Sequence, residues 1–259
     1  MYEINKNLIG HEDNLSILTN QISSQKLSNS LILYGNKGIG KNTFVYFFIN
    51  KYLNILFKNK NLNTSNLIYN NSHPNIRIIN KEYDEKTKKM KQNITIEQIR
   101  SISNFVYKSS INNLPKFVII DSADDLNKHS SNALLKVLEE PTNNTFIFLI
   151  AHQISILLPT IRSRCIKIRF NNPSIDEFKK ILLNINSTLS NEEIEFLFDI
   201  SNGSPGLAIE YYSKNINNTF ESLLNIFKEK KPLSSNILEL SNNVGSFDND
   251  EFKIFISLI

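Results

Sequence analysis

One short stretch of the sequence has the residues and the spacing of a phosphate-binding loop. It matches the pattern G-x-x-x-x-G-K, with glycines at Gly35, Gly38 and Gly40 and a lysine at Lys41. The loop follows the apolar run Ser30–Tyr34 and precedes a segment whose large apolar residues recur at helical spacing. At such a junction the backbone N–H groups point at phosphate oxygens, and the lysine adds a positive charge. We therefore predict that these glycines and the lysine form a nucleotide phosphate site.

The position after the lysine lacks the hydroxyl that binds Mg²⁺ in loops of this kind. It holds Asn42, and the nearest hydroxyl belongs to Thr43. One residue corresponds to a rotation of about 100° on a helix, so Thr43 cannot simply take the place of the missing group. An amide oxygen of Asn42 would be a weak ligand, and we expect poorer metal binding.

A second apolar run ends in a carboxylate. Phe117–Ile120 is followed by Asp121, which would hold Mg²⁺ through water. The next residue is Ser122, whose hydroxyl has no basic form near neutral pH and cannot activate a water molecule. Taken alone, Asp121 also fits a buried strand that ends in a capping aspartate, but the upstream loop favours the metal role. The sequence thus predicts a degenerate nucleotide site.

These segments need a sheet to position them, and the apolar runs predict one. Up to Phe170, short strands alternate with amphipathic helices, as is typical of a parallel α/β sheet flanked by helices. A capping box opens one helix at Thr95, and Pro141 stops another that begins at Ala133. The five expected strands are Ser30–Tyr34, Asn75–Ile79, Phe117–Ile120, Thr145–Ile150 and Cys165–Phe170.

After Phe170 the strand pattern stops, and two Ser-x-x-Glu capping boxes introduce helices instead. Asn171–Pro173 would be the hinge between the two parts. The apolar end of the sequence suggests a shortened or incomplete last domain. The expected domains are a P-loop nucleotide-binding-type domain over 1–171, a small helical lid over 172–212 and a partial helical collar over 213–259.

The composition excludes several classes of protein. A net charge of +4 is too small to indicate DNA binding by itself. The single cysteine, Cys165, excludes an intrachain disulfide and a multi-thiolate zinc site, so no zinc and no other metal centre are expected. No stretch approaches the roughly 18 apolar residues of a membrane span, and the start has no signal-peptide core. We expect a soluble, cytoplasmic protein without a membrane partner.

Three segments, in order along the chain, resemble the AAA+ clamp loaders of DNA replication. A similarity to the delta-prime subunits of bacterial DNA polymerase III in particular is carried by Ile9–His11, His73–Asn75, Asp84–Thr87 and Ile99–Arg100. The resemblance covers roughly residues 7–210 and implies the AAA+ form of the α/β fold. The three segments are Asp121–Asn127, Asn132–Pro141 with its Leu-Glu-Glu-Pro ending, and Leu157–Cys165 with its Ser-Arg-Cys ending.

The resemblance implies a role for Arg164 in trans. In this family the arginine of Ser-Arg-Cys reaches the nucleotide site of the neighbouring subunit, and Arg164 stands at that position. A guanidinium can meet phosphoryl charge bidentately and stabilise the transition state. Without the motif around it, an ordinary surface salt bridge would be the more common role for such an arginine.

The resemblance also indicates where the chain departs from motor subunits that hydrolyse ATP. Gly206 stands where motors carry a phosphate-sensing arginine, and His152 is the candidate for the polar sensor after the fourth strand. Asn42, Ser122 and Gly206 all fall on the chain's own site, while Arg164 is retained. Many delta-prime subunits also carry a four-cysteine zinc module, and this sequence lacks those cysteines.

Together these features predict a stator-type clamp-loader subunit within the DNA polymerase III holoenzyme. It would not be catalytic alone, with ATPase activity in neighbouring subunits, and it would need no cofactor, binding ATP and Mg²⁺ weakly at most. The expected partners are motor and delta-type subunits and, through the complex, the sliding clamp and primed DNA. The alternatives are a catalytically active motor-class ATPase of the same loader and an AAA+ module in recombination or repair.

Overall fold

The chain divides into two compact units, Met1–Asn172 and Pro173–Ile259. The computed structural model describes residues 8–56, 64–108, 114–142 and 144–214, together with eight scattered positions between 238 and 256. Most of the predicted collar, 213–259, therefore lies outside the described residues.

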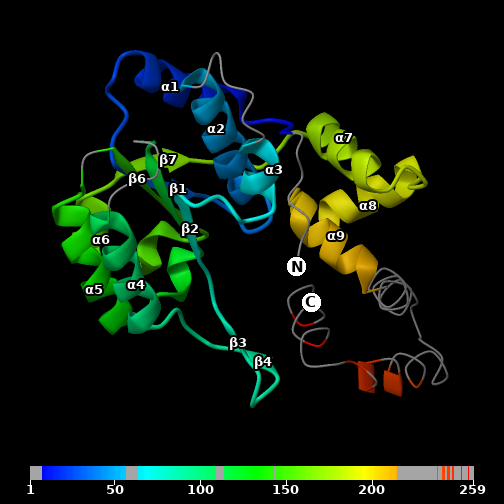
Figure 1. The fold of residues 1–259 in the computed structure, drawn as a ribbon. Coiled ribbons are helices and arrows are strands. Elements are labelled where there is room, and N and C mark those ends of the chain that lie inside the picture. Colours follow the sequence, from blue (N-terminus) through cyan, green and yellow to red (C-terminus); the bar gives the residue numbers. More distant parts are fainter. Residues whose placement is uncertain are drawn as a thin grey trace. The chain divides into compact units, whose positions relative to one another are not determined.

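The first unit is built on a parallel sheet of five strands in the order β2-β5-β6-β1-β7 (Figure 1). This confirms the predicted sheet, and every predicted strand end lies within one residue of the observed one. The inner strands β1, β5 and β6 are buried on both faces, which explains their unbroken apolar runs. The strands are β1 Ser30–Tyr34, β2 Ile76–Ile79, β5 Lys116–Asp121, β6 Thr145–Ala151 and β7 Ile166–Arg169.

Helices cover both faces of the sheet (Figure 1). Alternate residues of each strand point to opposite faces, so Leu31 and Leu33 pack with α1, α2 and α3, whereas Ile32 packs with α4, α5 and α6. The apolar stripe of α2 places Phe44 and Phe48 in the first of these cores. The helices are α1 Glu12–Ser23, α2 Lys41–Leu56, α3 Thr64–Tyr69, α4 Ile96–Tyr107, α5 Lys128–Glu139 and α6 Pro159–Ser163.

Helix α5 begins five residues earlier than predicted. The prediction started it at Ala133, but the observed helix starts at Lys128 behind the N-cap Asn127, whose side chain accepts a hydrogen bond from Ser130 N. The first turn contains no large apolar residue, so apolar spacing alone could not place it. The N-cap chemistry, rather than the spacing, sets this boundary.

A small hairpin projects between β2 and α4. It consists of β3 Tyr83–Asp84 and β4 Lys89–Met90, which pair antiparallel. The lysine-rich run Lys86–Lys91 contains part of the turn of this hairpin and its second strand. The lysines remain exposed or half-buried around the turn.

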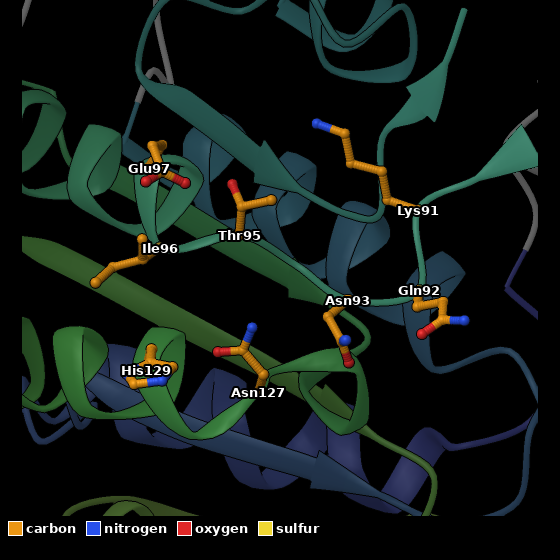
Figure 2. Close-up of a pocket in the computed structure, with 8 residues that line it drawn as sticks. All are labelled: Lys91, Gln92, Asn93, Thr95, Ile96, Glu97, Asn127 and His129. Carbon is orange, nitrogen blue, oxygen red and sulfur yellow. The ribbon is translucent and has the colours of Figure 1, made fainter. Parts of the chain in front are cut away.

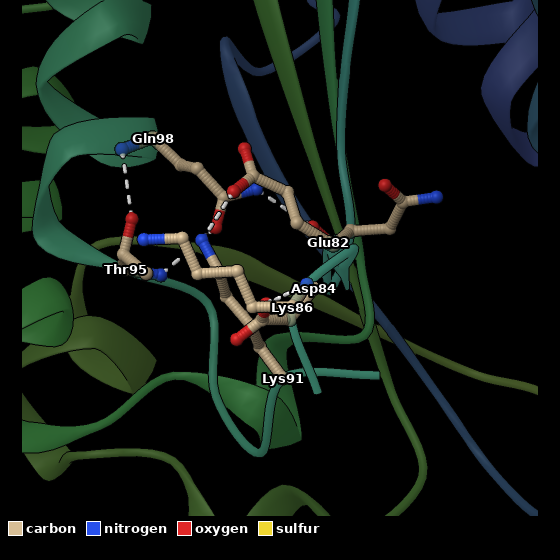
Figure 3. A network of polar contacts seen from close by, with 7 residues as sticks. Glu82, Asp84, Lys86, Lys91, Thr95 and Gln98 are labelled. Atoms are coloured by element: carbon tan, nitrogen blue, oxygen red, sulfur yellow. Dashed lines mark hydrogen bonds and ion pairs between the residues drawn. The ribbon is translucent and has the colours of Figure 1, made fainter. Parts of the chain in front are cut away.

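Polar contacts fix this hairpin and the start of α4 (Figure 3). Lys91 Nζ forms an ion pair with Glu82 Oε2 at 2.7 Å, and Asp84 Oδ1 accepts a hydrogen bond from Lys86 N at 2.9 Å. The predicted capping box of α4 is present between Thr95 and Gln98. These are short-range contacts, and they explain how a turn of charged residues keeps a defined shape.

Residues 173–214 of the second unit, the continuous part that the structure describes, form three helices, and the two predicted capping boxes, at Ser174 and Ser190, are present. Phe178, Leu182 and Leu197 are buried in its own apolar core. None of the helices in the described part of the chain is both long and apolar enough to cross a lipid bilayer. The helices are α7 Ile175–Ile185, α8 Asn191–Ile200 and α9 Pro205–Ser213.

Gly35, where β1 turns into the loop, is required by space as well as by conformation. Its φ is 152°, and a Cβ there would lie 2.3 Å from the backbone oxygen of Phe170. We predict that Gly35→Ala lowers the free energy of unfolding by roughly 3 kcal/mol, measured by urea denaturation. The matched control is Gly245→Ala, because a Cβ at Gly245 meets nothing within 4 Å. Equal stability of the two variants would contradict this prediction.

Candidate functional site

The predicted phosphate loop lies at the carboxyl end of β1, and α2 begins at its lysine. Gly38 and Gly40 have φ values of 79° and 92°, which only glycine adopts at little cost. The backbone N–H of Gly35 donates to Ala151 O at 3.3 Å and ties the loop to the end of β6. The first N–H groups of α2 have no partner within the helix, so they face the loop as an anion-binding surface.

The lysine of the loop is buried and satisfied by the loop itself. Lys41 Nζ donates to Gly35 O at 2.7 Å and to Asn36 O at 2.6 Å. Its burial lowers the pKa of Lys41 from 10.5 to about 8, and attraction to Asp121 and Asp124 opposes this shift. The ammonium thus lies inside the loop. There it can exchange its hydrogen bonds to the carbonyl groups for hydrogen bonds to a phosphate.

Asn42 and Asp121 form a direct contact between the first turn of α2 and the end of β5. Asn42 Nδ2 donates to Asp121 Oδ2 at 2.8 Å, across a separation of 79 residues. Asn42 Oδ1 is buried and has no hydrogen-bond partner among the described residues. Thr43, one residue further along α2, is half-buried, and the contact to the carboxylate is made by Asn42.

Burial raises the pKa of Asp121 from 3.8 to about 6; the positive charge of Lys41 opposes the shift, and Asp125 and Asp124 add to it. An acid with a raised pKa contributes to stability below its unfolded value, and that contribution is lost as the pH rises through about 6. Asp121 is therefore ionised at neutral pH, and an ionised carboxylate accepts hydrogen bonds only. This requirement fixes the nitrogen of Asn42, rather than its oxygen, toward Asp121.

The two other carboxylates after β5 are held by protein groups as well. Ser122 Oγ donates to Asp125 Oδ2 at 2.9 Å, and Lys81 Nζ lies 3.0 Å from Asp125 Oδ1. Asp124 accepts hydrogen bonds from the backbone N–H groups of His152 and Gln153, at 2.7 and 2.8 Å. Asp124 thereby joins the end of β5 to the residues that follow β6.

His152, the predicted candidate sensor, lies close to these groups. Its Nδ1 is buried without a hydrogen-bond partner among the described residues. Burial lowers the pKa of His152, and the positive charge of Lys41 lowers it further. A neutral imidazole beside the loop is consistent with a polar sensor, although its observed contact is made through the backbone.

The donor set around Asp121 does not fit a magnesium ion. A threonine or serine hydroxyl can donate its proton to the carboxylate and still offer a lone pair to the metal, whereas an amide nitrogen has no lone pair to offer. The loop, by contrast, fits a nucleotide phosphate, because its glycines open the backbone and Lys41 is already in place. No cluster of three or more histidine, cysteine or acidic side chains suited to a metal occurs among the described residues.

Arg164 follows the last residue of α6, and its contacts are with Glu139 and Thr160. Its Nη2 forms an ion pair with Glu139 Oε1 at 2.7 Å, and its Nη1 donates to Thr160 O at 2.9 Å. About a third of the Arg164 side chain, 35%, is exposed. The following residue, Cys165, is buried, and burial raises the pKa of its thiol to about 12, so it stays protonated.

Gly206 belongs to the second unit, where it is the second residue of α9.

The sequence did not predict the partner residues Lys81, Asp124, Asp125 and Glu139. Local signals for them existed: the two aspartates closely follow Asp121, and Glu139 belongs to the Leu-Glu-Glu-Pro segment.

A separate open pocket, also not predicted, lies where α4 and α5 begin (Figure 2). Its volume is about 520 Å³. Lys91 and Glu97 place opposite charges on its wall, among neutral amides, so it has no evident preference for phosphate. Its lining residues are Lys91, Gln92, Asn93, Thr95, Ile96, Glu97, Asn127 and His129.

The sheet order, the phosphate loop between β1 and α2, and the carboxylate at the end of β5 define a P-loop protein of the AAA+ class. Two solved structures share this fold at low identity. A gamma subunit-related protein of DNA polymerase III from Thermotoga maritima has a TM-score of 0.53 and 22% identity, covering 95% of this chain and 77% of that one. The Thermotoga maritima RuvB Holliday junction branch migration motor has a TM-score of 0.53 and 17% identity, covering 94% and 74%.

The chain belongs to the family described as DNA polymerase III, delta subunit, whose model matches residues 10–174. It is a clamp-loader protein of the delta-prime type. The Pseudomonas aeruginosa DNA polymerase III subunit delta' is 32% identical over 56% of this chain, and the Buchnera aphidicola (subsp. Baizongia pistaciae) subunit delta' is 28% identical over 85%. A gamma subunit of Buchnera aphidicola (subsp. Schizaphis graminum) is 27% identical over 92%. The matched regions span 42%, 67% and 61% of these relatives.

The lowered pKa of Lys41 gives a prediction about stability. The pKa of Lys41 falls from 10.5 to about 8 on folding. Its neutral form therefore contributes to the free energy of unfolding at pH values above 10.5, and this contribution is lost as the pH falls through about 8. The wild-type protein should therefore gain roughly 2 kcal/mol relative to Lys41→Met between about pH 8 and about pH 10. Urea denaturation of both proteins measures this difference, and parallel pH profiles would show that the ammonium is not destabilised by burial.

Proposed function

We propose that the chain is a stator-type subunit of the DNA polymerase III clamp loader. It donates Arg164 in trans to the nucleotide site of a neighbouring subunit and has little or no ATPase activity of its own. It requires no cofactor and no zinc for this role. The observation that carries the proposal is the contrast between a nucleotide site whose carboxylates are bound by protein donors and an accessible arginine.

The chain's own site supports the first half of this contrast. Hydrolysis needs a group that activates water, yet Ser122 follows Asp121 and donates its proton to Asp125. The Asn42 amide donates to Asp121, the carboxylate that would otherwise hold Mg²⁺ through water. The phosphate loop with Lys41 is kept, so the site is suited to binding a phosphate more than to transferring one.

Arg164 supports the second half. Its ion pair with Glu139 is partly exposed, with 35% and 48% of the two side chains accessible. Exposed ion pairs of this kind contribute only about 0–1 kcal/mol. A phosphoryl group with several negative charges can therefore displace Glu139 at little cost and bind the guanidinium through two of its N–H groups.

The partners follow from this role. An arginine acting in trans needs a subunit whose nucleotide site faces it, so motor-type and delta-type clamp-loader subunits are the proposed direct partners. The sliding clamp and primed DNA are proposed as partners of the assembled complex, in the cytoplasm. The names of the relatives, DNA polymerase III subunits delta' and gamma, support a place in such an assembly.

Two other functions are less well supported. A motor-class ATPase needs a metal ligand and a water-activating residue, and Asn42 and Ser122 provide neither. An AAA+ module for recombination or repair gains nothing from the likeness to RuvB, because at 17% identity that likeness concerns the fold. Capture of clamp-loader subunits from a reconstituted mixture by the tagged chain distinguishes this last function from the proposed one.

Removing the arginine tests the proposal directly. Arg164→Ala in the reconstituted loader should lower steady-state ATP turnover by a factor on the order of 10³, because the neighbour's transition state loses its guanidinium. The matched control is Arg77→Ala, which removes an exposed arginine from the edge strand β2. An unchanged rate in an intact complex would remove Arg164 from the mechanism.

A further inference from the structure

Replacing a hydroxyl with an amide at position 42 changes what can be bound beside Asp121. A hydroxyl oxygen can serve the carboxylate and a metal at the same time. Asn42 cannot serve both at once. Its nitrogen donates to Asp121 Oδ2, and its oxygen, the only atom that could ligate a metal, has no partner among the described residues. To ligate Mg²⁺ the amide must turn over and give up a hydrogen bond to a charged group, which is among the stronger hydrogen bonds in proteins.

All three carboxylates at this end of the sheet already have protein donors. Asn42 serves Asp121, two backbone N–H groups serve Asp124, and Ser122 and Lys81 serve Asp125. Metal ions are usually required where carboxylates converge without such partners. Here the hydrogen bonds and the Lys81 ammonium supply what a cation would supply.

We propose that the phosphate loop binds a nucleoside di- or triphosphate without Mg²⁺, with the Asn42 amide in place of the metal. Lys41 and the first N–H groups of α2 meet the phosphate charge, and Asn42 keeps Asp121 from repelling it. The inference rests on the part of the proposed function in which the loop keeps phosphate affinity. It is independent of Arg164.

Calorimetric titration of the purified chain with ATP and with ADP, in EDTA and in saturating Mg²⁺, tests the inference. The dissociation constant of the wild-type protein should change less than about threefold between the two conditions. The Asn42→Thr variant should bind the nucleotide at least about tenfold more tightly in Mg²⁺ than in EDTA, because a hydroxyl can bind the metal and the carboxylate at the same time. Asn42→Ser provides the same test if the threonine variant does not fold.

Two further variants control the experiment. Asn54→Thr makes the same exchange at an exposed position of α2 and should leave the metal response unchanged. Lys41→Met should abolish binding in EDTA, which places the nucleotide on the loop.

Three results would overturn the inference: wild-type binding that needs Mg²⁺ by tenfold or more, absence of nucleotide binding to the wild type, or an Asn42→Thr variant that does not respond to Mg²⁺. None of these results tests Arg164. The stator function is tested separately, by ATP turnover of the assembled loader.

Discussion

The hydrogen bond from Asn42 Nδ2 to Asp121 Oδ2 joins the start of α2 to the end of β5. In an active P-loop ATPase, a metal ion and a hydroxyl make this connection. Here an amide makes it, and the surrounding groups are consistent with that replacement. Ser122 is turned to Asp125, Asp124 is held by the backbone after β6, and Lys41 donates to the carbonyl groups of its own loop. The site is thus coherent as a polar network, although it is incomplete as a hydrolase.

This network is expensive to keep. Burial shifts Lys41 and Asp121 in the directions that disfavour their charged forms, and the attraction between them recovers only part of the cost. Replacing buried charges with apolar residues of similar volume is often neutral or stabilising. The presence of both buried charges supports the proposed phosphate binding, and the partly exposed Arg164 supports the proposed role in a neighbouring subunit.

Much of this could be predicted from local patterns. The inner strands β1, β5 and β6 are short runs buried on both faces, and the edge strands β2 and β7 have isoleucines at alternate positions, so each predicted strand end lies within one residue of the observed one. The loop glycines and Lys41 are adjacent in sequence, and their role follows from their setting. The missed features arise from contacts between distant segments. Neither spacing nor composition tells that Asn42 meets Asp121, that Lys81 meets Asp125, or that Glu139 holds Arg164. The start of α5 was missed because a polar first turn carries no apolar period.

The central claim is that the chain supplies chemistry to a neighbour and performs none itself. Steady-state ATP turnover by the purified chain alone, in saturating Mg²⁺ and beside Lys41→Met, tests it most directly. The two proteins should show the same background rate, because the wild-type site has neither a metal-binding hydroxyl at position 42 nor a base at position 122. Turnover typical of a motor subunit, abolished by Lys41→Met, would contradict it.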